Sequence, residues 1–227
     1  VDRSLAKKIR GSGPALAEEP PAGFKEHSLE VQLPFLQETV PDLKIVPVYL
    51  GEQSRANMDA LAGALEKYLK DSNTLLVFST DLSHFHSYDD AVRLDKKAIQ
   101  LIESCDVAAF IRADQKGDIE ACGMGPVGTS LLLAGKMGWS GPSLLRYANS
   151  GDVTGDHGSV VGYAAMVFKT KGEMDSGQGL SLKDQREILG YSRAVLKAKL
   201  EKKPEPKLSV AASMLDETRG IFVTLKK

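Results

Sequence analysis

The 227-residue sequence predicts an α/β fold. Two observations support it. Apolar residues recur every three or four positions in some segments and form short continuous runs in others, which are the patterns of helices and of buried strands. These two kinds of segment alternate along the first 170 residues. Such alternation predicts layers of helix and sheet with at least part of the sheet parallel.

Six helices are expected in this part of the chain. The first is ended by Gly11, and the second has Leu29, Leu33 and Leu36 at helical spacing. Pro34 should kink that second helix or confine its regular part to the first half, because proline interrupts a helix interior. The third carries one apolar face and stops near residues 71–73. The expected ranges are 1–10, 26–37, 58–69, 89–103, 106–113 and 126–137.

Four strands are expected between these helices. Each is a short apolar run, and the first ends at Gly51. The run at 74–78 is rich in residues that favour strands, and polar residues follow it directly. The expected strands are 43–50, 74–78, 144–148 and 160–168.

The character of the chain changes after Lys169. Residues 171–180 are polar and rich in glycine, which is typical of a linker. A helix is expected from Ser181 to Pro204, and a strand over 220–225. One helix and one strand cannot bury each other well, so residues 181–227 are expected to be an incomplete second α+β domain. Residues 1–170 form the first domain.

Composition excludes several function classes. The chain has 29 basic and 30 acidic residues, so it lacks the excess of positive charge that would indicate a nucleic-acid partner. Its longest apolar stretch is too short to span a bilayer, and no signal peptide is recognised at its start. Two cysteines are too few for a disulfide framework, which favours a reducing cytoplasm. The chain starts without a methionine and is interpreted as cut from a longer one.

The most informative segment is STDLSH at residues 79–84. In α/β sheets, ligands bind beyond the carboxyl ends of strands, and this segment follows the predicted strand 74–78. There, Asp81 and His84 are placed to bind a metal or to move a proton, with Asp81 fixing the tautomer of the imidazole. The alternative is structural: Asp81 or Ser83 caps a helix, and His84 packs against Phe85.

Five motifs in order along the chain resemble the Memo family, called AmmeMemoRadiSam system protein B in bacteria and archaea. They are EHSLEVQLPFLQ at 26–37, VPVYLG at 46–51, STDLSH at 79–84, CGMGP at 122–126 and YANSGD at 147–152. The resemblance covers roughly residues 1–170. In the tail, LKDQ at 182–185 and RGIFVTLKK at 219–227 resemble the start of an AMMECR domain, the protein A of that system.

The resemblance implies a three-layer α/β/α sandwich similar to the class III extradiol (LigB-like) dioxygenases, which bind non-haem iron. It implies that His27 and Cys122 are ligands of an iron or copper ion, with Asp81 and His84 lining the same pocket. The family's amino-terminal strands, which carry another pocket histidine, have no counterpart in this sequence. The implied partners are the AMMECR domain in the same chain and a radical SAM protein; the small-molecule or peptide ligand is unknown.

The local sequence gives each ligand candidate two interpretations. His27 stands between Glu26 and Ser28, so it is either a ligand oriented by a carboxylate or a surface residue at a helix start. Cys122 precedes a predicted helix, where the helix dipole favours a thiolate that binds soft metals; the alternative is a small buried cysteine. We assign that structural role to Cys105. His86 is expected to be exposed, and His157 is a less favoured ligand in a turn-rich loop.

Three functions follow. The first is a cytoplasmic, metal-binding redox protein or dioxygenase-like enzyme of the AmmeMemoRadiSam system. The second is a non-catalytic pocket protein that binds peptides or partner proteins. The third is a metal-free hydrolase with Cys122 as nucleophile and His84 as base.

Overall fold

A computed structural model describes most of residues 1–169 and a few further positions. The described residues are 1–13, 16, 27–40, 42–69, 74–169, 190–191, 194–195, 197–199, 201–204 and 206. The chain divides into two compact units, one of residues 1–171 with 220–227 and the other of residues 172–219. The predicted linker at 171–180 and the predicted strand at 220–225 lie outside the described residues. The described positions between 190 and 199 are helical, as predicted.

Five helices of the first unit match the predictions closely, because their apolar spacing buries one face of each. Asp2, Ser87 and Asp106 cap the starts of three of them by accepting backbone N–H bonds. Gly138, in the left-handed conformation, ends a fourth. The helices are α1 (Arg3–Arg10), α3 (Arg55–Leu69), α4 (Tyr88–Glu103), α5 (Val107–Gln115) and α6 (Met124–Met137).

The helix predicted at 26–37 was wrong in its position. Helix α2 spans Leu33–Thr39, and residues 28–32 form turns. Pro34 therefore lies in the first turn of α2 instead of ending a helix. The first turn tolerates proline, because the backbone N–H groups there have no partner within the helix.

The sheet contains three strands in the order β1–β3–β2, and both pairs are antiparallel. Strands β2 (Ser143–Asn149) and β3 (Val160–Val167) confirm two predictions. The short helix α7 (Gly151–Thr154) lies in the turn-rich connection between them. Strand β1 (His84–His86) was not predicted, because three residues with two histidines carry no strand pattern.

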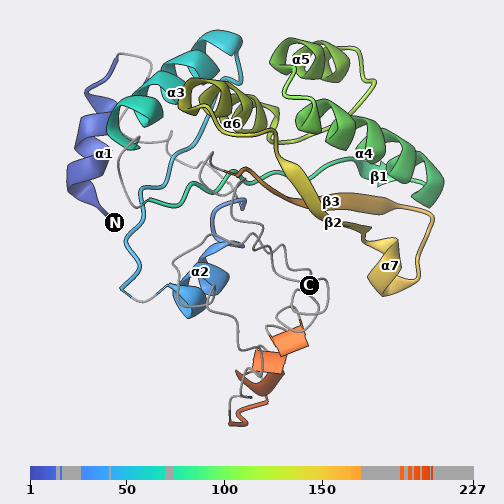
Figure 1. Ribbon diagram of the computed structural model, residues 1–227. Coiled ribbons are helices and arrows are strands. Elements are labelled where there is room, and N and C mark those ends of the chain that lie inside the picture. The colour runs from blue at the N-terminus through green and yellow to red at the C-terminus, as the bar shows by residue number, and fades with distance from the viewer. Residues whose placement is uncertain are drawn as a thin grey trace. The chain divides into compact units, whose positions relative to one another are not determined.

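The other two predicted strands, 43–50 and 74–78, are not strands in the structure. A strand requires a neighbour in register as well as an apolar composition, and composition does not provide the neighbour. The expected parallel pairing was also wrong for the described sheet, because both of its strand pairs are antiparallel. Figure 1 shows both as extended traces without arrows.

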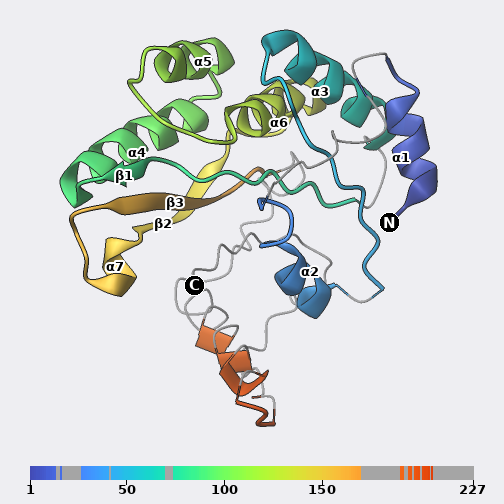
Figure 2. The same ribbon diagram turned by 180° about the vertical axis from the view of Figure 1, so that it is seen from behind.

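Helix α4 packs against all three strands, and α3 packs against α6. Figures 1 and 2 show α3 to α6 together on one side of the sheet. One core cluster, which includes the fully buried Phe110, joins α4, α5 and α6 to the sheet. A second, which includes Leu61 and Leu133, joins α1, α3 and α6. The first unit is thus a mixed α/β structure, and the predicted three-layer sandwich stays a prediction.

None of the described helices is both long enough and apolar enough to cross a membrane.

Candidate metal centre

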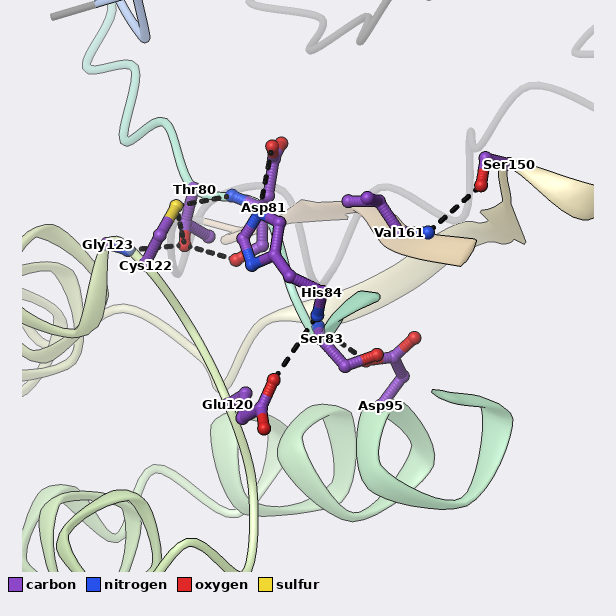
Figure 3. Close-up of polar contacts among 10 residues, drawn as sticks. All are labelled: Thr80, Asp81, Ser83, His84, Asp95, Glu120, Cys122, Gly123, Ser150 and Val161. Atoms are coloured by element: carbon purple, nitrogen blue, oxygen red, sulfur yellow. Dashed lines mark hydrogen bonds and ion pairs between the residues drawn. The ribbon is translucent and has the colours of Figure 1, made fainter. Parts of the chain in front are cut away.

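Three side chains from two distant segments converge beside strand β1. The ligand atoms of Asp81, His84 and Cys122 all lie within 4.8 Å of one another. The Nε2 atom of His84 is 3.5 Å from Oδ2 of Asp81. Asp81 and His84 are half-buried, and Cys122 is exposed. Figure 3 shows the sulfur, the carboxylate and the imidazole gathered at the start of β1.

Two reciprocal bonds join the backbone of Asp81 to Cys122. The N–H of Asp81 donates to Sγ of Cys122 over 3.2 Å, and the N–H of Cys122 donates to the carbonyl of Asp81 over 3.3 Å. Each residue therefore fixes the other, although 41 positions separate them. The sulfur is held by an N–H donor on the side that faces Asp81.

Thr80 and Gly123 complete this junction. The Thr80 hydroxyl donates to the carbonyl of Asp81 over 2.7 Å and accepts the N–H of Gly123 over 2.8 Å. A Cβ atom on Gly123 would lie 2.7 Å from Cβ of Thr80 and 2.8 Å from the Ser79 carbonyl. Position 123 therefore has no room for a side chain, and the two segments can approach only because it is glycine.

The side-chain amide of Gln53 holds the turn that carries Cys122. Its Nε2 donates to the carbonyl of Cys122 over 3.0 Å, and its Oε1 accepts the N–H of Gly125. Cys122 directly precedes Gly123, the N-cap of α6. This confirms the prediction that Cys122 lies at a helix amino terminus.

Glu120 supports the histidine side of the cluster. Its carboxylate accepts the backbone N–H of His84 over 3.2 Å and pairs with Nε2 of His86 over 2.8 Å. Burial acts to raise the pKa of Glu120, but the bonds from His86 and His84 outweigh it, so the pKa is lowered. The expectation that His86 is exposed was wrong, because the ring is half-buried against Glu120.

One part of the structural interpretation of the 81–84 segment, the helix cap, was wrong. No helix starts at Asp81 or Ser83: strand β1 begins at His84, and Ser87 caps the helix that follows. The His84 ring does lie near Phe85, with centroids 5.8 Å apart. His157 is exposed and stacks on Tyr88 with centroids 4.5 Å apart, outside the three-residue cluster.

His27 is not a member of the three-residue cluster found among the described residues. Its side chain is 77% exposed, and its Nδ1 lies 2.5 Å from Oε1 of Glu30. The same segment approaches the cluster at one point, where Nε2 of Gln32 donates to the Ser79 hydroxyl over 3.1 Å. The role of His27 as a ligand stays a prediction.

Sequence reasoning missed three residues that bond to the backbone of these segments: Thr80, Glu120 and Asp95, whose Oδ1 accepts the N–H of Ser83 over 2.9 Å. One of them had a visible signal. Asp95 stands on the apolar face of the predicted helix 89–103, in line with Ala91, Ala98 and Ile102, where a charged residue is out of place. Thr80 lies inside the STDLSH segment, but only Asp81 and His84 were singled out there, and Glu120 gave no signal, since single polar residues in loops are common.

The donor set fits a transition metal. Imidazole nitrogen, thiolate sulfur and carboxylate oxygen together suit iron, copper or zinc better than magnesium or calcium, which prefer oxygen. Two ligand atoms at about 2.0–2.3 Å from one ion lie at most about 4.6 Å apart. The observed limit of 4.8 Å therefore requires only small side-chain movements to close around an ion.

Comparisons with known proteins agree with the resemblance seen in the sequence. A family model described as Memo-like protein matches residues 1–167. A MEMO1 family protein of Pyrobaculum aerophilum is 36% identical over 170 residues, which is 74% of this chain and 60% of that protein. One of Methanopyrus kandleri is 35% identical over 174 residues, covering 74% of this chain and 61% of that protein.

The matches cover only part of this chain and only part of its relatives. The chain spans 60% and 61% of the length of these two relatives. The family model ends at residue 167 and does not reach 181–227. The predicted AMMECR domain and the radical SAM partner therefore stay predictions.

Proposed function

Because this chain belongs to the family of Memo-like proteins, we propose that Asp81, His84 and Cys122 hold an iron or copper ion in a redox protein. The convergence of these three donors within 4.8 Å carries the proposal. A redox metal there would supply electron transfer and activation of small oxidants, which the side chains alone do not provide. The sequence predicted Cys122 as a ligand and Asp81 with His84 as a catalytic pair.

The surrounding contacts support this choice. The N–H of Asp81 already points at the sulfur, so the sulfur is oriented before any ion binds. Glu120 holds the backbone of His84, which limits where the imidazole can reach. Hydrogen-bonded outer residues of this kind orient ligands and raise metal affinity.

His27 is the candidate for a fourth ligand in this proposal. Gln32, in the same segment, bonds to Ser79, two positions before Asp81. The segment is therefore anchored near the cluster, and His27 would have to leave Glu30 to join it. Substitution of His27 by alanine is then expected to weaken metal binding about tenfold.

Metal binding is tested directly on the full chain. We expect close to one equivalent of iron or copper after purification, and a Co²⁺ complex with the absorption band of a thiolate ligand. Cys122→Ser should abolish that band and weaken the Kd for Co²⁺ at least about tenfold. Cys105→Ser is the matched control, because it makes the same exchange at the other cysteine and should leave both unchanged.

The proposal fails if the wild-type chain takes up no metal and gives no thiolate band with Co²⁺. It fails equally if Cys105→Ser and Cys122→Ser reduce the band to the same extent, since the loss would then reflect folding.

A second candidate is the metal-free hydrolase. Cys122, His84 and Asp81 lie in an order that resembles a nucleophile, a base and an orienting acid, with His84 Nε2 3.5 Å from Asp81. Thioester or ester hydrolysis that survives exhaustive chelation and is lost in Cys122→Ala would favour this function over the metal centre.

A further inference from the structure

Asp95 is a fully buried carboxylate that the candidate metal centre does not itself use. It lies on α4 with 0% exposure. Oδ1 accepts the backbone N–H of Ser83 over 2.9 Å, and Oδ2 accepts the Tyr147 hydroxyl over 2.7 Å. Burial and the bond to Asp95 raise the pKa of Tyr147, so that hydroxyl stays protonated and donates. The carboxylate thus links α4, β2 and the segment between Asp81 and His84.

The backbone of β3 is shaped around this carboxylate. A Cβ atom on Gly162 would lie 1.8 Å from Oδ2 of Asp95. The backbone of Gly162 also accepts the N–H of Leu82 over 3.0 Å and donates to the carbonyl of Ser83 over 2.9 Å. A glycine inside a strand marks such a close approach. Gly162 therefore holds Leu82 and Ser83, the two residues between the two ligands, and Asp95 holds one of them, Ser83.

Four successive N–H groups of this segment have four different acceptors. Asp81 donates to the Cys122 sulfur, Leu82 to the Gly162 carbonyl, Ser83 to Asp95 and His84 to Glu120. Figure 3 shows Asp95 and Glu120 below the segment and the candidate ligands above it. Only the bond to Asp95 combines a charged acceptor with full burial, where a charge-assisted bond is strongest.

We propose that Asp95, oriented by Tyr147, is the positioning residue that sets the spacing of Asp81 and His84 through the Ser83 N–H. This inference rests on the proposed metal site. Asp95 touches no ligand atom; it fixes the backbone from which both ligands extend. Without the Asp95 carboxylate, the N–H of Ser83 would be buried without an acceptor, so the segment would have to move to reach water.

The test uses the full chain and two measurements, the hydrogen exchange of the Ser83 amide without metal and the Kd for Co²⁺. Asp95→Ala should raise Ser83 exchange at least about tenfold and weaken Co²⁺ binding about 10–100-fold. Asp95→Asn should return the Kd to within about threefold of wild type. The reason is that its Oδ1 still accepts from Ser83 and its Nδ2 can donate to the Tyr147 oxygen.

Ile102→Ala is the stability control, since Ile102 is buried two turns further along α4 and its apolar side chain makes no hydrogen bond to the 81–84 segment. It should lower the free energy of unfolding but leave the Kd for Co²⁺ unchanged. If Asp95→Ala does not fold, Tyr147→Phe decides the question. That variant removes one hydroxyl, and we expect Ser83 exchange and the Kd each to rise about threefold.

Equal losses of Co²⁺ affinity in Asp95→Ala and Ile102→Ala would overturn the inference. So would a Ser83 amide that is unprotected from exchange in the wild type, or a Tyr147→Phe variant whose Ser83 exchange and Kd equal those of the wild type. If the wild-type chain binds no Co²⁺, the proposed function fails, and Ser83 exchange alone still decides whether Asp95 positions the segment. If the wild type binds Co²⁺ and Asp95→Ala binds it equally, only this inference fails.

Discussion

The two cysteines of the chain lie at two helix boundaries with opposite surroundings. Cys105 stands between α4 and α5, packs against the apolar core cluster and has a left-handed backbone with φ of 56°. Burial raises the pKa of its thiol. Cys122 stands before α6, is exposed, and accepts the N–H of Asp81. The same residue type is structural in one place and a ligand candidate in the other, because the neighbouring donors and the access of water differ.

Each cysteine also has a glycine close by that leaves no room for a side chain. At Gly141, a Cβ atom would meet the Glu103 carbonyl at 2.9 Å and the Cys105 sulfur at 3.4 Å. At Gly123, it would meet Thr80 and Ser79 at 2.7–2.8 Å. Tight packing is therefore common to both regions. What distinguishes Cys122 is that it has two polar neighbours, Thr80 and Asp81.

The largest expected difference between the two regions is in thiol reactivity. At pH 7, Cys122 should react with iodoacetamide on the order of 100-fold faster than Cys105, because Cys122 is exposed and burial raises the pKa of the Cys105 thiol. The raised pKa of Cys105 means that its thiolate fraction, and its rate, should still be rising above pH 9.0, the ordinary value. Mass spectrometry of the two peptides over a range of pH measures both rates. Comparable rates at pH 7 would remove the distinction.

The next largest expected effect distinguishes a loss of packing from a loss of metal binding. Gly123→Ala and Gly141→Ala should each lower the free energy of unfolding by about 1–3 kcal/mol, since both overpack a tight site. Only Gly123→Ala should also weaken the Kd for Co²⁺, because it pushes Thr80 and Asp81 away from Cys122. Denaturant melts and Co²⁺ titrations of the two variants make the comparison. Loss of Co²⁺ binding in Gly141→Ala would show that the metal site depends on general packing.

The smallest effect concerns the cap beside Cys105. Asp106 Oδ1 accepts the N–H of Ala109 over 2.8 Å at the start of α5. Asp106→Ala should cost about 1 kcal/mol of unfolding free energy, the usual loss for such a cap. It should leave Cys122 reactivity and Co²⁺ binding as in the wild type. A change at Cys122 would mean that the two regions are coupled through α5 and α6.

Several features of the chain could be predicted from its sequence alone. Apolar spacing located five of the helices, because burial of one face requires it whatever the neighbours are. Short apolar runs identified β2 and β3. The segment at 79–84 and the cysteine before a helix were recognised from residue types and position. The five motifs indicated the family, and the match over 1–167 confirms it.

Other features were decided only by the tertiary structure. Whether residues 43–50 and 74–78 become strands depends on a hydrogen-bonding neighbour, which may lie anywhere in the chain and leaves no local pattern. The grouping of Asp81, His84 and Cys122 depends on backbone bonds across 41 positions. Local sequence reports what a residue can do, and packing decides which residues it meets. That is why the helices were predictable and Glu120, which supports His84 from a distant segment, was not.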